Sequence, residues 1–166
     1  MKNISIKLIT ENKKDFLPLL LLGDEDERQI DKYLERGDLF ALYENGSDEI
    51  ASDLKSVCVV TDEDNNTLEI QNLATYEHCQ RQGYASMLIE YIAEYYAVKN
   101  KSRKRAFEKI ILGTGDVPWI LAFYNRCGFK ETHRIPDYFT NNYDFPIIDS
   151  GILLKDKIYL ERNINL

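Results

Sequence analysis

The sequence predicts one α/β domain with a mixed, mostly antiparallel central sheet of about seven strands and about four flanking helices. Two observations lead to this class. In the first half of the chain, segments with strand-like alternation are separated by short polar turns, which is typical of antiparallel pairs. In the second half, an amphipathic helix is followed by alternating apolar runs and short helices, which indicates a mixed sheet. The 166 residues and the 44% hydrophobic content suit a single domain spanning residues 1–166.

The N-terminal part is expected to form a strand and two helices. Residues 2–9 alternate between apolar and polar side chains, with the period of two of an edge or half-buried strand. Residues 11–22 are rich in apolar side chains but contain Pro18, so we expect a short or broken helix there. The acidic residues 24–27 suit the positive N-terminus of a second helix, which Gly37 ends.

Three antiparallel strands are expected to follow these helices. Their predicted ranges are 39–43, 50–60 and 67–75, and the middle strand ends in a run of core-like residues. Turn-forming residues at 44–46 and at 62–66 separate the three strands. The chain therefore builds most of an antiparallel sheet before its longest helix.

The second half of the chain alternates between helices and strands. Residues 83–97 carry apolar side chains at helical spacing, and residues 109–113 read as a short buried strand. A short helix is expected over residues 119–126, because Gly128 follows it closely. We expect a long loop from about 134 to 151 and a last strand from 152 to 160.

Composition and charge exclude several classes of protein. There are 28 acidic and 21 basic residues, and a net charge of -7 repels nucleic acid. No stretch has the apolar length of a membrane helix, and the N-terminal residues lack the apolar region of a signal peptide, so we expect a cytoplasmic protein that does not enter membranes. The spacing of Cys58, Cys79 and Cys127 argues against disulfides and zinc, and no metal is expected.

The segment Leu73–Ser86 carries the strongest functional signal, because a strand passes through a polar loop into the longest predicted helix. The first N–H groups of a helix have no intrahelical partner, and the helix dipole makes that end positive. Gly83 and the small residues Ala85 and Ser86 allow a ligand to approach closely. The residues alone therefore indicate either a generic phosphate site or a tight turn between strand and helix.

Two motifs in this order resemble those of the GNAT superfamily of N-acetyltransferases. Gln80-x-x-Gly83-x-Ala85 is similar to the acetyl-coenzyme A (acetyl-CoA) motif of the family, and Tyr124 followed by Gly128-Phe129 is similar to its second signature. The predicted order of elements resembles the same fold across nearly the whole chain. The tail and residues 113–116 look like a subgroup of uncharacterised bacterial members.

The resemblance implies acetyl-CoA as the co-substrate and a strand pair that splays apart to hold its pantetheine arm. The strand ending at Leu73-Ala74-Thr75 would expose main chain to this arm, and an N–H near Leu73 or Ala74 would polarise the thioester carbonyl. The first turn of the helix would bind the diphosphate. The implied cofactor-binding residues are Leu73, Ala74, Thr75, Gln80, Arg81, Gln82, Gly83, Tyr84, Ala85 and Ser86.

The resemblance also implies two catalytic residues. Tyr124 would act as the general acid that protonates the leaving thiolate, although a tyrosine beside two phenylalanines also suits a core position. Glu69 would take the proton from the acceptor amine, or it would only pair with a neighbouring cation. His78 and His133 are alternative bases. Val117 stands where many relatives carry an asparagine that contacts the cofactor, and Asp116 is its possible replacement.

The implied reaction is direct acetyl transfer, in a ternary complex, to a primary amine of a small molecule or peptide. Residues 24–27, Asp137 and Asp144 would line the acceptor cleft, and an acidic cleft favours cationic amines. The aromatic residues of the 134–151 segment suggest either a lid or a dimer contact, in a monomer or a homodimer. A non-catalytic acetyl-CoA sensor and a protein-interaction domain are the alternative functions.

Overall fold

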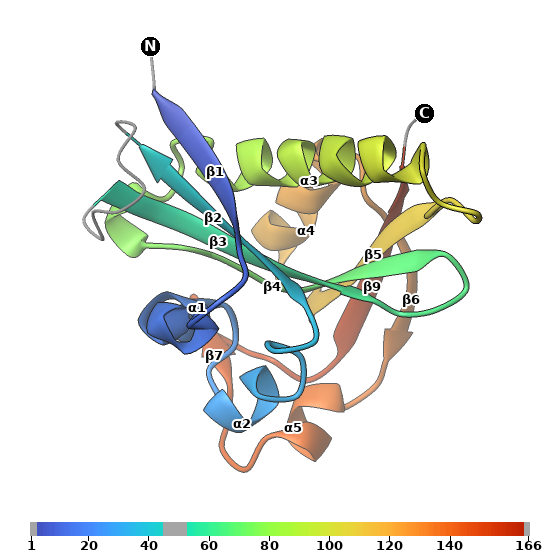
Figure 1. Ribbon diagram of the computed structural model, residues 1–166. Coiled ribbons are helices and arrows are strands. Elements are labelled where there is room, and N and C mark those ends of the chain that lie inside the picture. The colour runs from blue at the N-terminus through green and yellow to red at the C-terminus, as the bar shows by residue number, and fades with distance from the viewer. Residues whose placement is uncertain (1–2, 45–52, 165–166) are drawn as a thin grey trace.

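The computed structural model describes residues 3–44 and 53–164 (Figure 1). Seven strands form one sheet in the order β1-β2-β3-β4-β5-β9-β6, and within it β4 and β5 pair in parallel while the other neighbours are antiparallel. The strands are β1 (Ile4–Ile9), β2 (Asp38–Glu44), β3 (Leu54–Asp62), β4 (Thr67–Thr75), β5 (Lys109–Gly115), β6 (Lys130–Ile135) and β9 (Lys157–Asn163). The predicted mixed, mostly antiparallel α/β class is confirmed.

The turn between β3 and β4 shows why the polar residues 62–66 end one strand and begin another. Asp64, Asn65 and Asn66 all have positive φ angles, between 50° and 66°. Short side chains of this type tolerate the left-handed region better than most residues. The predicted turn at 45–46 and the predicted strand start at 50–52 lie outside the described residues.

The helices cover both faces of the sheet (Figure 1). On one face lie α3 (Tyr84–Asn100) and α4 (Pro118–Arg126), and on the other lie α1 (Leu17–Gly23) and α2 (Glu27–Ile30). The predicted first helix is broken, because the 3₁₀ turn η1 (Lys13–Phe16) precedes Pro18 near the start of α1. The predicted second helix forms only one α-helical turn, and irregular turns carry the chain on to Gly37. No helix in the described ranges is long and apolar enough to cross a membrane.

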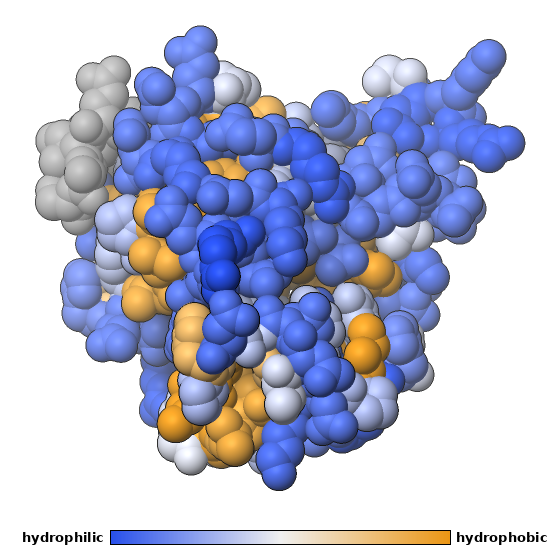
Figure 2. All heavy atoms as spheres, turned by 90° about the horizontal axis from the view of Figure 1, so that it is seen from below, coloured by the Kyte–Doolittle hydropathy of each residue, from blue (hydrophilic) through white to orange (hydrophobic). Residues whose placement is uncertain are grey.

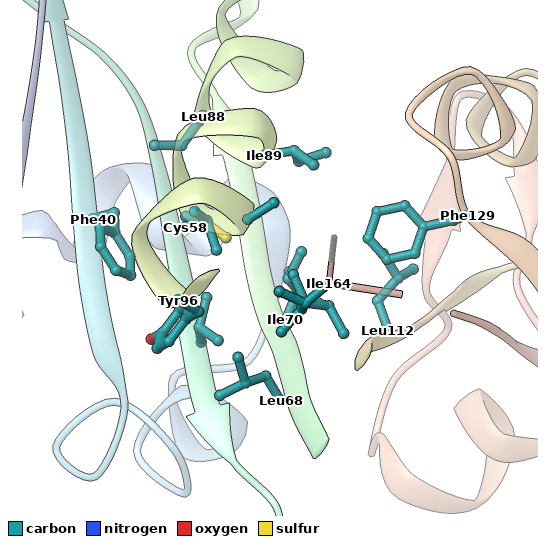
Figure 3. Packing of buried hydrophobic residues seen from close by; sticks show 14 of the residues in the cluster. Phe40, Cys58, Leu68, Ile70, Leu88, Ile89, Tyr96, Leu112, Phe129 and Ile164 are labelled. Atoms are coloured by element: carbon teal, nitrogen blue, oxygen red, sulfur yellow. The ribbon is translucent and has the colours of Figure 1, made fainter. Parts of the chain in front are cut away.

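The main core lies between the sheet and α3. Figure 3 shows Leu88, Ile89 and Tyr96 of α3 packing toward the strands. The ring of Tyr96 meets Phe40 of β2 edge to face, with the ring centroids 6.1 Å apart. A second core on the opposite face is built from α1, α2 and the other side of β2, β3 and β4. The side chains of β4 are thus packed against a core on each face of the sheet, which fixes the position of this strand.

The tail differs from the sequence-based prediction. The segment predicted as a loop contains the end of β6, α5 (Tyr138–Asn142) and β7 (Ile148–Asp149), and β7 pairs with β8 (Ile152–Leu153). The last long strand therefore begins at Lys157, and the predicted start at residue 152 is wrong. Ile147 and Leu154, which flank this hairpin, are buried together with Val117, so the tail has a small core of its own.

Candidate active site

The strands β4 and β5 separate halfway along their length. Their parallel register runs from Thr67 opposite Lys109 to Ile70 opposite Leu112 and then stops. A β-bulge lies at this point, because Val59 and Val60 of β3 pair with Asn72 and Ile70, which leaves Gln71 as the extra residue. A bulge bends its strand away from a regular ladder. The structure therefore contains a splayed strand pair, as the resemblance implies.

The main chain of β4 faces the resulting gap at alternate residues. The N–H of Tyr76 donates to the carbonyl of Lys55 on β3 (3.2 Å), and Ser56 Oγ donates to the carbonyl of Ala74 (2.8 Å). Successive residues of a strand point their main-chain groups to opposite sides. The polar groups of Leu73 and Thr75 therefore point toward the gap, while those of Ala74 are directed to β3.

The loop before α3 forms a cradle of main-chain donors. Arg81 and Gly83 have left-handed backbone conformations, with φ angles of 63° and 89°. Gly83 is the N-cap of α3, and no cap side chain bonds to the first N–H groups of this helix, which point toward its N-terminal end. A Cβ atom at Gly83 would meet no described atom within 4 Å, which places open space directly beside these donors. Main-chain donors at a helix N-terminus are suited to binding a phosphate group.

The other predicted residues of this loop have structural contacts. Gln80 Nε2 donates to the carbonyl of Thr75 (3.2 Å) and so ties the loop to the end of β4. Gln82 Nε2 donates to the carbonyl of His78 (3.3 Å), and the buried Tyr84 donates its hydroxyl to Glu44 Oε2 (2.6 Å). Ala85 and Ser86 lie in the first turn of α3, where their N–H groups face the N-terminal end of the helix.

Tyr124 lies on α4, with its ring edge to face against Phe123 and Phe129 at centroid distances of 5.1 and 5.8 Å. It packs against the same core as Leu73, on the α3 side of the gap. Burial, followed by the neighbouring thiols of Cys58 and Cys127, raises the pKa of the phenol above its usual range. Tyr124 makes no hydrogen bond through its hydroxyl to any described residue, whereas the hydroxyls of Tyr33, Tyr84 and Tyr96 donate to carboxylates.

Glu69 lies on β4 two residues before the bulge. Its neighbours Leu68 and Ile70 face the α3 core, so its side chain faces the side of α1 and α2. Burial raises the pKa of its carboxyl group, while Lys157 opposes this shift. Within the described part of the chain no cation lies within 4 Å of Glu69, so simple ion pairing does not account for it.

A pocket of about 360 Å³ lies where the resemblance places the acceptor cleft. It is bounded by the end of α1, the α2 region, the tail, Gln71 at the bulge and residues 113–115 of β5. It therefore opens onto the gap between β4 and β5 from the side opposite Tyr124. Figure 2 views the molecule from the side of α2 and α5 and shows hydrophobic side chains exposed among a largely hydrophilic surface.

The pocket is not the acidic cleft that the sequence predicts. Asp24 and Glu25 line it, together with Asp149, but three cations, Lys32, Arg36 and Lys157, line it too. The other predicted acidic residues have structural partners or lie elsewhere. Asp26 caps α2 and bonds Arg28, Glu27 pairs with Lys14, Asp144 pairs with Arg28, and Asp137 lies outside the lining.

A chain of hydrogen bonds connects the bulged strand to the tail across this pocket. Asn72, next to the bulge, donates through Nδ2 to the hydroxyl of Tyr33 (3.1 Å) and to the carbonyl of Leu20 (2.9 Å). Tyr33 donates to Asp24 Oδ2 (3.1 Å), and Tyr143 of the tail donates to Asp24 Oδ1 (2.9 Å). Burial raises the pKa of the Asp24 carboxyl group, and the two tyrosine hydroxyls oppose this shift.

Replacing Asn72 by alanine is expected to destabilise the protein by about 2 kcal/mol, because two buried hydrogen bonds are lost. For a chain of this size, this corresponds to a melting temperature lower by roughly 4 to 8 °C in differential scanning calorimetry. Asn125→Ala, at an exposed position of α4, is the control and should change the melting temperature little. Equal melting temperatures for the two variants would show that the chain of hydrogen bonds does not stabilise α1 on β4.

The histidines and the position before α4 lie away from the pocket lining. His78 is exposed and stacks on Tyr76, and His133 stacks on Tyr159 with the centroids 4.8 Å apart. Val117 is fully buried in the tail core, and Asp116 pairs with Arg134 at 3.2 Å. Neither histidine is placed to act on an acceptor in the pocket.

Two residues of the site carried no usable signal in the sequence. Asn72 and Lys157 are far apart along the chain, and neither belongs to a motif. Lys157 lines the pocket, and Asn72 reaches the lining residue Tyr33 through a hydrogen bond. Only the path of the folded chain brings the two residues to the site.

Comparisons with known proteins agree with this geometry. The family model for the acetyltransferase (GNAT) domain matches residues 35–131. The uncharacterized N-acetyltransferase YvbK of Bacillus subtilis (strain 168) is 31% identical over 161 residues, which cover 96% of this chain and 96% of YvbK. A solved GNAT family acetyltransferase from Elizabethkingia anophelis with acetyl-CoA bound has a TM-score of 0.84 and 30% identity, over 97% of this chain and 98% of that one. The IAA acetyltransferase from Bacillus cereus ATCC 14579 has a TM-score of 0.81 and 32% identity, over 97% and 99% of the two chains. The chain belongs to the GNAT family of acetyltransferases.

Proposed function

We propose that residues 1–166 form one N-acetyltransferase domain that moves the acetyl group of acetyl-CoA directly onto a primary amine in a ternary complex. The observation that carries this proposal is the gap between β4 and β5. The donor cradle before α3 lies at one end of it, Tyr124 packs on one side, and the pocket opens from the other side. The family membership and the acetyl-CoA bound to the Elizabethkingia anophelis protein support the co-substrate.

The residues divide the work of the reaction between the two sides of the gap. The first N–H groups of α3 would hold the diphosphate, and the main chain at Leu73 and Thr75 would align the pantetheine arm. Acetyl-CoA supplies an acetyl thioester, whose C–S bond breaks as the new C–N bond forms. Tyr124 would donate its proton to the departing thiolate, and Glu69 would receive the proton of the amine through water.

Glu69→Gln is expected to lower kcat by roughly 10- to 100-fold. The loss is smaller than for a base that contacts the amine directly, because water can carry the amine proton to another acceptor. The carboxylate is the active form, so activity falls as the pH drops through the pKa of Glu69. Burial raises this pKa above its ordinary 4.5, which places the acidic limb of the pH profile above pH 4.5. Steady-state rates between pH 5 and 9 would measure it.

The control for this variant is Glu94→Gln, at an exposed position on α3. It should keep both the rate and the acidic limb of the wild-type protein. An unchanged limb in Glu69→Gln would assign the amine proton to another group.

The first test of the function is thermal stability with and without acetyl-CoA. A ligand at 100 times its dissociation constant adds about 2.7 kcal/mol to the free energy of unfolding. Stabilisation together with release of free CoA thiol in the presence of amines supports an enzyme. Stabilisation without thiol release for any amine would indicate a sensor, and no stabilisation at millimolar acetyl-CoA would favour a protein-interaction domain.

A further inference from the structure

The distribution of charge in the pocket at residues 113–115 points to a class of acceptor. We propose that the acceptor is a small molecule that carries a carboxylate as well as the amine that is acetylated, and that Lys157 binds this carboxylate. The inference rests on the proposed function, because it concerns the acceptor side of the same site.

The acidic residues of the pocket are close to one another. Burial raises the pKa of Glu25, and repulsion from Asp149 and Asp24 raises it further. Asp24 follows Gly23, the residue that packs against Asn72 and Ala74 of β4: a Cβ at Gly23 would lie 2.1 Å from Asn72 Oδ1. The cluster of Asp24, Glu25 and Asp149 therefore lies next to the bulged strand β4. In the proposed reaction the acceptor binds here as an ammonium ion before its deprotonated amine attacks the acetyl thioester.

Lys157 provides the opposite charge on the β5 side of the pocket. Its stem crosses Gly113, since a Cβ there would lie 2.1 Å from Lys157 Cε. The ammonium lies 4.2 Å from the ring centroid of Tyr138 and 5.1 Å from that of Tyr159. Burial lowers the pKa of this amine, but Tyr159, Tyr138 and Glu69 outweigh it, so the net shift is upward and the group is charged at neutral pH.

Lys157 differs from the other two cations of the lining in what it contacts. Arg36 forms an ion pair with Glu63 at 2.7 Å, and Lys32 donates to Gln29 Oε1 at 3.0 Å. Among the described residues, no carboxylate lies within 4 Å of the Lys157 ammonium. A half-buried cation gains most from an anion that the bound molecule itself brings.

The size and walls of the pocket restrict the rest of the acceptor. A volume of about 360 Å³ is at the lower end of the range of roughly 300 to 1,000 Å³ for small-molecule sites. Aromatic side chains from the turns after α2 and from the tail line it: Tyr33, Tyr138, Phe139 and Tyr143. An apolar body between amine and carboxylate matches these walls. A polyamine would instead place a second cation beside Lys157, which like-charge repulsion disfavours.

The test compares amines that differ only in the carboxylate. The pairs are 4-(aminomethyl)benzoate with benzylamine, phenylalanine with 2-phenylethylamine, and 6-aminohexanoate with pentylamine, and cadaverine is added as a diamine. In at least one pair the carboxylate-bearing member is expected to have a kcat/KM higher by roughly 10- to 100-fold, the effect of one charge-assisted hydrogen bond. Lys157→Met should reduce this ratio to near one, and Lys157→Arg should keep most of it.

Lys155→Met is the matched control, because Lys155 is an exposed lysine of the same tail that does not line the pocket. It should leave the ratio unchanged. The proposal is overturned if the neutral amines or cadaverine are preferred in every comparison, or if Lys157→Met keeps the wild-type ratio.

Binding is measured in parallel, which separates this inference from the proposed function. Each amine is added to the protein with and without CoA, and the rise in melting temperature is recorded. Greater stabilisation by the carboxylate-bearing members, lost in Lys157→Met, supports the inference even if acetyl-CoA shows no turnover. Equal stabilisation by both members of every pair overturns it, whereas failure of acetyl-CoA itself to stabilise the protein counts against the proposed function.

Discussion

Tyr124→Phe is expected to lower kcat by roughly 100- to 1,000-fold, within the range for loss of a general acid. The variant removes one hydroxyl that makes no hydrogen bond to a described residue, so packing against Phe123 and Phe129 is kept. Affinity for acetyl-CoA should change little, because the proposed binding mode uses mostly main-chain groups. Stopped-flow or steady-state assays of thiol release, with thermal stabilisation by acetyl-CoA as the binding measurement, would separate the two effects.

The pH profile adds a second check on Tyr124. A general acid works in its protonated form, so activity falls as the pH rises through its pKa. Burial raises this pKa above the ordinary value of about 10, so Tyr124 should cause no alkaline loss of activity at or below pH 10. Tyr91→Phe on α3 is the control and should keep full activity. A Tyr124→Phe variant with at least half of the wild-type kcat would remove Tyr124 from the mechanism and leave it a core residue.

Gly83→Val is expected to weaken acetyl-CoA binding by roughly 100-fold or more. A β-branched residue at a φ of 89° is strained by about 1–3 kcal/mol, and its side chain would enter the open space beside the first N–H groups of α3. Both effects act on the donors that are proposed to hold the diphosphate. Isothermal titration with acetyl-CoA would measure the loss, and a dissociation constant within threefold of the wild-type value would contradict the assignment of the cradle.

The variant Gly151→Val separates the effect of backbone strain from the effect of a side chain that blocks the N–H groups of α3. Gly151 has nearly the same backbone conformation, with a φ of 84°, and a Cβ there also meets nothing described within 4 Å. It lies in the tail hairpin between β7 and β8, away from the cradle. Both variants should lose similar stability, while only Gly83→Val should lose affinity for acetyl-CoA.

Local periodicity was enough to predict most of the fold. The alternation in β1, the apolar runs of β2 and β3 between polar segments, and the spacing of apolar residues in α3 are local patterns, so they could be found from the sequence. The strand β6 was missed because its six residues are all exposed at the edge of the sheet, which leaves no apolar face to detect. The β7–β8 hairpin was missed for another reason: Ile147 and Leu154 are buried against Val117, which is distant in sequence.

The candidate site divides in the same way. The cradle at Arg81 and Gly83 is a local feature of one loop, so a short motif predicted it. The charge of the pocket is not local. It depends on which acidic residues form ion pairs elsewhere, and Asp26 and Asp144 both pair with Arg28. It also depends on the side chain of Lys157, which crosses Gly113 to reach the pocket. The resemblance supplied the place of the cleft, but residue type alone supplied its charge, so an acidic cleft was predicted where the structure has charges of both signs.

The short parallel register between β4 and β5 has a mechanical consequence. It joins two halves of the sheet, β1–β4 and β5-β9-β6, through a seam of four residue pairs. A pantetheine arm bound in the gap would contact both β4 and β5 beyond the point where the hydrogen bonds between these strands end, and it would so connect the two halves of the sheet. Amide hydrogen exchange at residues 67–70 and 109–112 should therefore slow when the gap is filled, although no bound atom touches those amides. The half of the sheet that carries Lys157 would then be held at a fixed distance from the half that carries Asn72.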